Sequence, residues 1–252
     1  MQHEVVSQEK WLEARMALFA KEKALTHAHD ELARERRALP WVKVEKPYRF
    51  DGPFGKLSLA DLFDGRSQLL MQHFMLGPGW EAGCPGCSFM ADHVDAARQH
   101  FEHADLSFVA VSRAPLAEIQ RYRERMGWQF PWVSSFGSDF NYDFGVSFTK
   151  EQLAAGKVFY NYGMTDGYDE LQGVSVFYKD EAGDVFHTYS TYSRGAESFL
   201  GTFMFLDLVP KGRNETSTMN WVRRHDEYED DGRTQPRSAA AAPACCHGEK
   251  AA

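Results

Sequence analysis

The chain has 252 residues, of which 43% are hydrophobic and 25% are charged, and its formal net charge is −8. This length and composition are typical of a globular protein with one main domain. The negative charge argues against a nucleic-acid surface, and no basic leader or run of about 18 apolar residues indicates export or membrane insertion. We therefore expect a cytoplasmic protein whose partners include neither nucleic acid nor a membrane.

The first forty residues predict a helical arm. The helix is expected over residues 7–38, with Ser7 as its N-cap, and it stops before Pro40. An apolar residue recurs every seven positions, at Trp11, Leu18, Leu25, Leu32 and Leu39. The stripe is narrow, because the intervening positions are poor coiled-coil core. We interpret residues 1–40 as an arm packed on its own domain; the alternative is a contact between subunits, and thus a homodimer.

Residues 41–228 predict the main domain, which begins with alternating strands and helices. The expected elements are strands at 48–50 and 56–59 around a turn, a helical turn at 60–63, a buried strand at 68–76, a principal helix at 85–102, a strand at 106–112, and a helix from Pro115 to near Gly127. Alternation of this kind implies a parallel sheet with right-handed crossovers.

The second half of this domain predicts a different pattern. A short strand at 130–134 and a helical turn at 139–145 precede an aromatic-rich and glycine-rich insertion at about 147–172 that has no clear periodicity. A hairpin of residues 174–179 and 185–189 and a final helix at 195–207 follow. Residues 229–252 have too little apolar periodicity to fold alone, so we expect a flexible, disordered C-terminal tail.

The most informative motif is Cys84-Pro85-Gly86-Cys87, which follows the buried strand and opens the principal helix. Residues three apart on a helix share a face, with Cα atoms roughly 5 to 6 Å apart, so the two thiols can form a disulfide with little backbone movement. In a reducing compartment such a pair is redox-active or binds a metal more often than it forms a structural disulfide.

The position of the motif predicts different roles for its two sulfurs. If Pro85 is the first helical residue, Cys84 is the N-cap, and its sulfur can accept the backbone N–H of Gly86 or Cys87. Cysteines in such settings have pKa values lowered from about 8.5 to about 3.5 to 7.5. Cys84 is therefore the candidate nucleophile. Cys87 heads a core-facing stripe and is the candidate shielded, resolving thiol.

Several other residues could have a role in function, but each also has a purely structural explanation. Glu81, in the loop before the motif, could act as a general base for Cys87 or be an exposed loop acid. His93 could tune the thiols or be a packed helix histidine. Cys245, Cys246 and His247 could bind a metal or relay electrons, or belong to an incidental tail. A cluster of aromatic residues could line a substrate pocket near the thiols or form core: Phe136, Phe140, Tyr142, Phe144, Phe159, Tyr160 and Tyr162.

Two sets of sequence segments resemble known families. The segment Phe50-Asp51-Gly52 to Leu59, with Leu62-Phe63-Asp64-Gly65, resembles the lead-in of peroxiredoxins and of thioredoxin-like proteins of the alkyl-hydroperoxide-reductase type. More specific segments, at 11–15, 35–41, 111–115, 136–145 and 187–192, resemble a bacterial family of predicted dithiol-disulfide oxidoreductases otherwise labelled a domain of unknown function. The resemblance runs from about residue 8 to 228. It implies a thioredoxin-like α/β fold, a central mixed sheet flanked by helices, in which Cys84 and Cys87 are the family's cysteine pair.

The chain departs from better-known relatives at three places. Gly173 stands where thioredoxins usually have a cis-proline facing the disulfide. Gly77 and Glu81 stand where peroxiredoxins need a proline and a threonine, which disfavours peroxidase chemistry of that type. The dipeptide between the cysteines is Pro-Gly instead of Gly-Pro, a change that can shift the redox potential widely.

These observations favour a thiol-disulfide oxidoreductase. Cys84 would attack a substrate disulfide, and Cys87 would resolve the mixed disulfide. The cysteine pair is itself the redox centre, so no organic cofactor is expected. The expected partners are a protein or small-molecule disulfide or thiol and an unidentified thiol reductant. The alternative is a non-catalytic metal-binding or thiol-sensing protein on the same scaffold.

Overall fold

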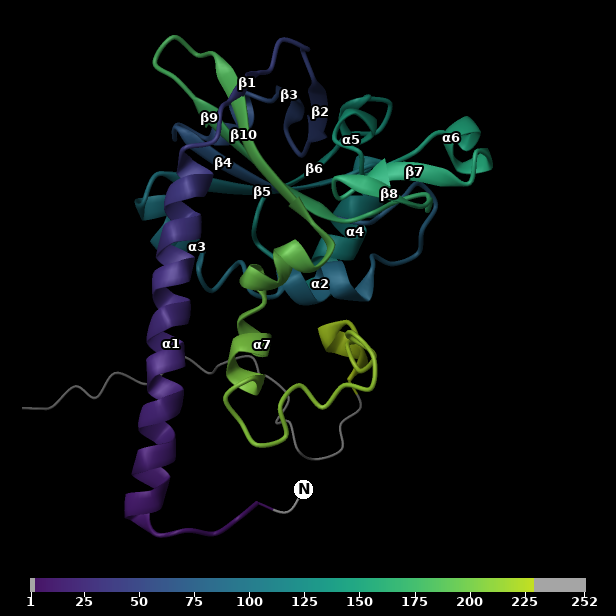
Figure 1. Cartoon of the computed structure of the whole chain (residues 1–252). Coiled ribbons are helices and arrows are strands. Elements are labelled where there is room, and N and C mark those ends of the chain that lie inside the picture. The colour runs from purple at the N-terminus through teal and green to yellow at the C-terminus, as the bar shows by residue number, and fades with distance from the viewer. Residues whose placement is uncertain (1–2, 229–252) are drawn as a thin grey trace, which may run out of the picture.

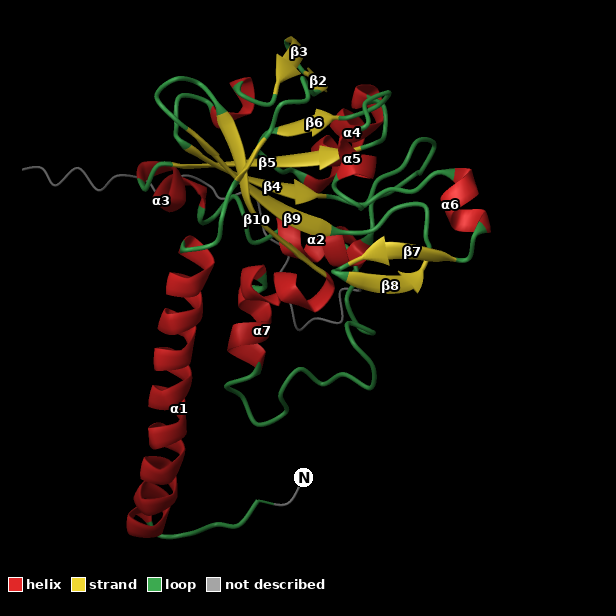
Figure 2. Ribbon diagram, turned by 45° about the horizontal axis from the view of Figure 1, so that its top comes forward, coloured by secondary structure: helices red, strands yellow, loops and turns green. Residues whose placement is uncertain are grey.

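The computed structural model of the protein describes residues 3–228, and an eight-stranded mixed sheet forms its centre (Figures 1 and 2). The strand order is β1-β10-β9-β4-β5-β6-β2-β3. The strands of this sheet are β1 (Val42–Lys43), β2 (Arg49–Gly52), β3 (Gly55–Ser58), β4 (Gln68–His73), β5 (Leu106–Ser112), β6 (Trp132–Ser134), β9 (Gly173–Lys179) and β10 (Val185–Tyr192).

The middle of the sheet combines parallel and antiparallel pairing. β4 pairs in parallel with β5, and β5 pairs in parallel with β6. On the other side β4 pairs antiparallel with β9, which forms a hairpin with β10. The predicted strand-helix-strand-helix half and the predicted hairpin are therefore both present. The expected thioredoxin-like fold is confirmed.

Apolar side chains cover both faces of the central strands, as expected for a sheet buried on both sides. Leu69 and Met71 of β4 pack into one apolar cluster, and Leu70 packs into the clusters on the opposite face. The first cluster is covered by the 3₁₀ turn η1 (Asp61–Phe63) and by α5 (Phe140–Asp143). The other face is covered by α2 (Pro85–Ala91) and α4 (Leu116–Met126).

The expectation of one principal helix at 85–102 is wrong, because this segment forms two helices. The first, α2, ends at Ala91, and the second, α3, spans Arg98–His103. The imidazole of His93 explains the break. Its Nδ1 lies 2.7 Å from the carbonyl oxygen of Phe89, the acceptor that the His93 N–H would use in a continuing α-helix. The His93 N–H instead donates to Met90 at 3.1 Å, so the chain tightens into turns.

The expected final helix at 195–207 is also wrong, since it divides into the 3₁₀ helix η2 (Ser193–Phe199) and α7 (Gly201–Leu206). Leu200 lies between them with φ −101° and ψ 75° and is buried against Phe89 and Met90. The Thr202 N–H donates to Nε2 of His93 at 3.0 Å. His93 therefore carries its proton on Nδ1 and connects the end of α2 to the start of α7.

The N-terminal helix α1 (Gln8–Arg37) forms as expected, and the Ser7 side chain accepts the Lys10 N–H at its start. Its expected packing on the domain is wrong, because α1 has no buried residue and Trp11, Leu18, Leu25 and Leu32 are about half exposed. Figure 1 shows the helix extending away from the sheet. The Arg36 guanidinium lies 4.8 Å from the ring centroid of Tyr189, near the base of the helix. A contact between subunits through α1 stays a prediction.

The segment at 147–172 contains regular structure that its sequence did not indicate. It forms α6 (Lys150–Ala154) and a hairpin of β7 (Lys157–Tyr160) and β8 (Gly163–Asp166) (Figure 1). The hairpin turn places the non-glycine residues Asn161 and Tyr162 at φ 51° and 63°. Since turns of this kind usually contain glycine, the turn signal was weak.

No helix within residues 3–228 is long and apolar enough to cross a membrane. The predictions for the tail, including those for Cys245, Cys246 and His247, lie outside the described residues.

Candidate active site

The Cys84-Pro85-Gly86-Cys87 motif lies where the sequence predicted, after β4 and at the start of α2. Pro85 begins the helix and Cys84 is its N-cap, with extended backbone angles of φ −56° and ψ 132°. The Cys84 N–H donates to the Met75 carbonyl at 3.1 Å, which anchors the motif to the end of β4. Gly83 is required just before it, because a Cβ there would lie 2.4 Å from Phe74.

Cys84 is half-buried, and its surroundings lower the pKa of its thiol to about 6. The largest cause is a hydrogen bond from the Cys87 thiol, and the backbone N–H groups of Cys87 and Gly86 and the charge of Arg224 contribute in the same direction; burial opposes them. The two amides do not make a well-aligned cap bond to the sulfur. The Cys84 pKa is thus lowered, as predicted, but mainly by the thiol of Cys87. The start of the helix contributes less.

Cys87 has the opposite environment. It is 3% exposed, and the pKa of its thiol is raised by its hydrogen bond to Cys84, by burial and by the negative charge of Cys84. The Met75 N–H, 3.5 Å from the Cys87 sulfur, opposes this increase. Both cysteines are free thiols. The accessible sulfur is therefore the more acidic of the two.

Several residues that stabilise the motif were not found from the sequence. The Arg224 guanidinium donates to the Gly83 carbonyl at 2.6 and 2.9 Å, which places a positive charge beside Cys84. Ser88 donates to the Cys84 carbonyl at 2.9 Å and therefore accepts the hydroxyl of Tyr122 at 2.8 Å. Arg224 lies 140 residues after Cys84 in the sequence, so no local pattern could indicate their contact.

The two cysteines lie in the wall of a cavity of about 320 Å³, which we call the dithiol cavity. Its lining is mainly apolar and comes from separate parts of the chain: Met75, Met90, Leu171, Ala196, Leu200 and Met219. Two charged residues, Arg194 and Glu197, also line it, and they pair with each other at 2.7 Å. The cavity therefore contains apolar surface and a neutralised ion pair beside a reactive sulfur.

Gly86 keeps the centre of this cavity open. A Cβ at Gly86 would lie 3.4 Å from the Met219 methyl group and 3.8 Å from the Cys84 sulfur. A side chain there would fill the space between Met219 and the Cys84 sulfur. The Pro-Gly dipeptide thus has two functions in the structure, since Pro85 starts the helix and Gly86 leaves the sulfur accessible.

The other residues singled out from the sequence lie elsewhere. Glu81 does not line the dithiol cavity; it is exposed and lines a separate hollow with Glu118, Arg121 and Arg125. His93 connects α2 with α7, as described above. Gly173 begins β9, and a Cβ there would lie 2.6 Å from the Tyr192 ring. Leu171 and Gln172, just before Gly173, line the dithiol cavity, and residues 3–228 have no cis peptide bond.

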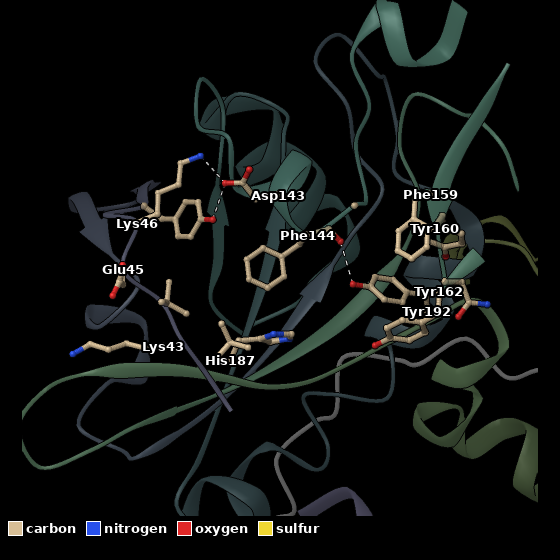
Figure 3. Close-up of a pocket in the computed structure, with 15 residues that line it drawn as sticks. Lys43, Glu45, Lys46, Asp143, Phe144, Phe159, Tyr160, Tyr162, His187 and Tyr192 are labelled. Atoms are coloured by element: carbon tan, nitrogen blue, oxygen red, sulfur yellow. Dashed lines mark hydrogen bonds and ion pairs between the residues drawn. The ribbon is translucent and has the colours of Figure 1, made fainter. Parts of the chain in front are cut away.

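A second cavity, of about 430 Å³, lies beside the β7–β8 hairpin and contains neither cysteine (Figure 3). Four residues of the predicted aromatic cluster line it: Phe144, Phe159, Tyr160 and Tyr162. Of these, only Tyr160 also lines the dithiol cavity. We call this space the aromatic cavity. In the part of the chain from residue 3 to 228, no group of three or more His, Cys, Asp or Glu residues could hold a metal ion.

Comparison with known proteins places the chain in a family. Residues 1–228 match the family described as "Bacterial protein of unknown function (DUF899)". The chain belongs to this family. No curated protein matches it.

The chain has distant neighbours among solved structures. Peroxidoxin BcpB from Mycobacterium tuberculosis is 17% identical, with a TM-score of 0.39 over 65% of this chain and 95% of its own. A peroxiredoxin Q mutant from Xanthomonas campestris is 15% identical, with a TM-score of 0.40 over 62% and 90%. A putative protein disulfide isomerase from Bacteroides thetaiotaomicron is 16% identical, with a TM-score of 0.35 over 66% and 91%.

Proposed function

We propose that the protein is a dithiol-disulfide oxidoreductase in which Cys84 is the nucleophile and Cys87 the resolving thiol. The observation that carries the proposal is the opposite pKa shift of two adjacent sulfurs at the wall of a cavity. Thiolates attack disulfides and thiols do not, so a pKa of about 6 makes Cys84 the reactive group at neutral pH. The cysteine pair itself supplies the two electrons that reduce the substrate disulfide.

The first step forms a mixed disulfide. The Cys84 thiolate attacks one sulfur of a substrate R–S–S–R′, the Cys84–S–R bond forms, and R′–S⁻ leaves. The leaving thiolate takes a proton from solvent or departs as an anion. Arg224 and the two backbone N–H groups stabilise the negative charge on Cys84 before the attack. Its low pKa also makes Cys84 a good leaving group in the reverse direction.

The second step closes the Cys84–Cys87 disulfide and depends on a change in charge. While Cys84 is ionised, its hydrogen bond and its charge raise the pKa of Cys87. Once Cys84 is part of a mixed disulfide, that charge is gone, and the Met75 N–H still favours the Cys87 thiolate. Cys87 then loses its proton to water, attacks Cys84 and releases R–S⁻. The substrate gains two electrons, and the protein loses two.

The dithiol cavity favours a small, largely uncharged substrate. A volume of about 320 Å³ lies in the range of pockets that bind small molecules. Its charged residues already pair with each other, so a charged substrate would lose its hydration without gaining a partner. Met219 and Leu200 line the cavity together with Cys84. A protein disulfide is bulky and would need an open, flat surface around the sulfur. We therefore propose low-molecular-weight, uncharged disulfides and thiols as the substrate class.

The test is single-turnover oxidation of the reduced protein by three disulfides: bis(2-hydroxyethyl) disulfide, cystine and insulin. Each rate is divided by the rate at which dithiothreitol reduces the same disulfide. This ratio corrects for the intrinsic reactivity of each disulfide. We expect the neutral small disulfide to react at least about tenfold faster than the other two on this scale. Mass spectrometry of the Cys87→Ser variant should detect a mixed disulfide on Cys84.

The outcomes separate the hypotheses. Rapid reaction with insulin would support a thiol-disulfide oxidoreductase but overturn the proposed substrate class. If the Cys87→Ser variant forms no mixed disulfide while the purified protein retains stoichiometric zinc or copper, the metal-binding alternative is favoured and the proposal is wrong.

A further inference from the structure

The aromatic cavity has the features of a ligand site separate from the dithiol. Its volume of about 430 Å³ exceeds that of the dithiol cavity and lies in the range of small-molecule pockets. Its walls come from four segments that are distant in sequence: the strand and loop at 42–48, the end of α5, the β7–β8 turn, and β10. Figure 3 shows their side chains around one space.

Six of the fifteen residues that line it are phenylalanine or tyrosine. The Tyr192 ring lies against those of Tyr160 and Tyr162, with centroids 5.3 and 5.8 Å apart. The Phe144 ring meets the His187 ring edge to face at 5.4 Å. Phe159, 62% exposed, completes the mouth of the cavity. Flat rings at several angles offer both faces and edges to a planar ligand, which is the geometry that aromatic pairs prefer.

The charges around the cavity argue against a charged ligand. The Lys46 ammonium group bonds to Asp143 at 2.6 Å and to Asp139 at 2.8 Å. The Lys43 ammonium group bonds to Asp184 at 2.5 Å. Each cation therefore already has a carboxylate partner and is not free to bind an anion. The same ion pairs also engage Asp143 and Asp184, so these carboxylates are not free to bind an organic cation.

The turn that carries two of the rings is held in an unfavourable backbone conformation. Asn161 and Tyr162 both lie in the left-handed region, where a bulky residue such as tyrosine is rarely found. The Tyr162 hydroxyl donates to the Ser190 carbonyl at 2.8 Å and fixes the ring against β10. Strain of this kind concentrates at binding and catalytic sites.

A buried hydrogen-bond chain ends at the wall of the cavity. His187 Nε2 contacts Ser190 at 2.7 Å, Ser190 contacts Ser175 at 2.8 Å, and Ser175 contacts His73 Nε2 at 2.8 Å. Burial lowers the pKa of His73 to about 3 and also lowers that of His187, so both rings are neutral. Nδ1 of His73 is buried without a partner in the described residues. A polar chain like this is costly in a core, and its outer end, His187, lines the cavity.

We propose that the aromatic cavity binds an uncharged, planar aromatic small molecule that bears a hydroxyl or carbonyl group. The rings of Tyr160, Tyr162, Tyr192 and Phe159 contact its faces and edges. The polar substituent reaches the polar groups of the lining, His187 and Asn161. This lining contains no cysteine, serine or threonine, and its two lysines are held in ion pairs, so we assign it as a binding site and not as a second reaction centre. The inference is independent of the proposed redox function.

The experiment measures binding of 2-naphthol to the full chain by its fluorescence and by chemical shift changes of backbone amides. Decahydro-2-naphthol is the non-planar control of similar size, and naphthalene-2-sulfonate is the charged control. We expect saturable 1:1 binding of 2-naphthol that is about tenfold tighter than that of either control, with shift changes at residues 159–162 and at Tyr192. Equal affinities for 2-naphthol and decahydro-2-naphthol would overturn the proposal.

Two variants and one modification locate the site. Phe159→Leu should weaken 2-naphthol binding several-fold, whereas Tyr168→Leu should not, because Tyr168 is equally exposed but lies outside the lining. Both side chains are exposed, so the substitutions should leave the fold intact. Alkylation of Cys84 should also leave the affinity unchanged. If alkylation abolishes binding, the ligand occupies the dithiol cavity and the proposal is wrong.

Discussion

The two cavities share one wall residue, Tyr160, but differ in what they can do. Its ring belongs to the aromatic cavity, while its hydroxyl donates to the Gln172 carbonyl at 2.7 Å and accepts the Ser193 N–H at 3.1 Å, both at the dithiol cavity. Both spaces are mainly apolar, and the charges of each lining are largely paired. In the proposed function, reactivity therefore comes from the two sulfurs and from Arg224, and not from the shape or polarity of the space. On this view, the pKa shifts of the two thiols are what distinguish the dithiol cavity from the aromatic cavity.

The largest expected effect separates the two cavities completely. Cys84→Ser should lower the rate of disulfide exchange by at least about a thousandfold, since it removes the nucleophile. The same variant should bind 2-naphthol with unchanged affinity. Single-turnover oxidation and the fluorescence titration measure the two properties on one sample. Substantial exchange activity in this variant would show that Cys84 is not the nucleophile.

A smaller effect concerns the pH dependence of the dithiol. Cys84 is reactive as a thiolate, so its rate of alkylation by iodoacetamide should be maximal above pH 7 and fall as the pH decreases through about 6. Cys87, whose pKa is raised, should react slowly across this range. Mass spectrometry after timed quenching distinguishes the two sites.

Arg224→Gln sharpens the same measurement. Loss of the positive charge should raise the Cys84 pKa and slow alkylation at pH 6 by about two- to fivefold. Arg223→Gln is the matched control, because Arg223 bonds to carbonyl groups of its own segment. An identical pH profile in wild type and Arg224→Gln would rule out a contribution of Arg224.

The smallest effect tests whether the shared wall couples the cavities. Tyr160→Phe keeps the ring, so 2-naphthol affinity should change by less than about twofold. It removes the hydrogen bonds to Gln172 and Ser193, so oxidation by bis(2-hydroxyethyl) disulfide should slow by about two- to fivefold. Unchanged kinetics would mean that the two cavities are independent.

Local sequence patterns predicted the parts of the fold that depend on local physics. The strands at β4, β5 and the β9–β10 hairpin and the helix α4 follow from periodicity, from Pro115 and from Gly127, which ends α4 at φ 68°. The motif also indicated which cysteine is accessible and which is shielded. These features depend on residues within a few positions of one another.

The features that were missed depend on contacts between distant segments. The two helix breaks follow from His93, whose imidazole reaches Thr202 more than a hundred residues later. Met219 and Arg224 complete the surroundings of Cys84 from far along the chain. The β7–β8 hairpin was missed because Tyr162 occupies a conformation that usually indicates glycine. The loop acid Glu81 was near in sequence but lies in a different hollow.

The position of Arg224 has a consequence for the modularity of this fold. The strands, the helix α2 and both sulfurs are complete by residue 192, yet the cation that lowers the Cys84 pKa and the methionine that faces Gly86 arrive only in the last residues before 228. A chain cut after β10 would lack both residues, and without the charge of Arg224 the pKa of its Cys84 thiol would be higher. In this chain, part of the acidity of the Cys84 thiol therefore comes from residues that follow the sheet in the sequence.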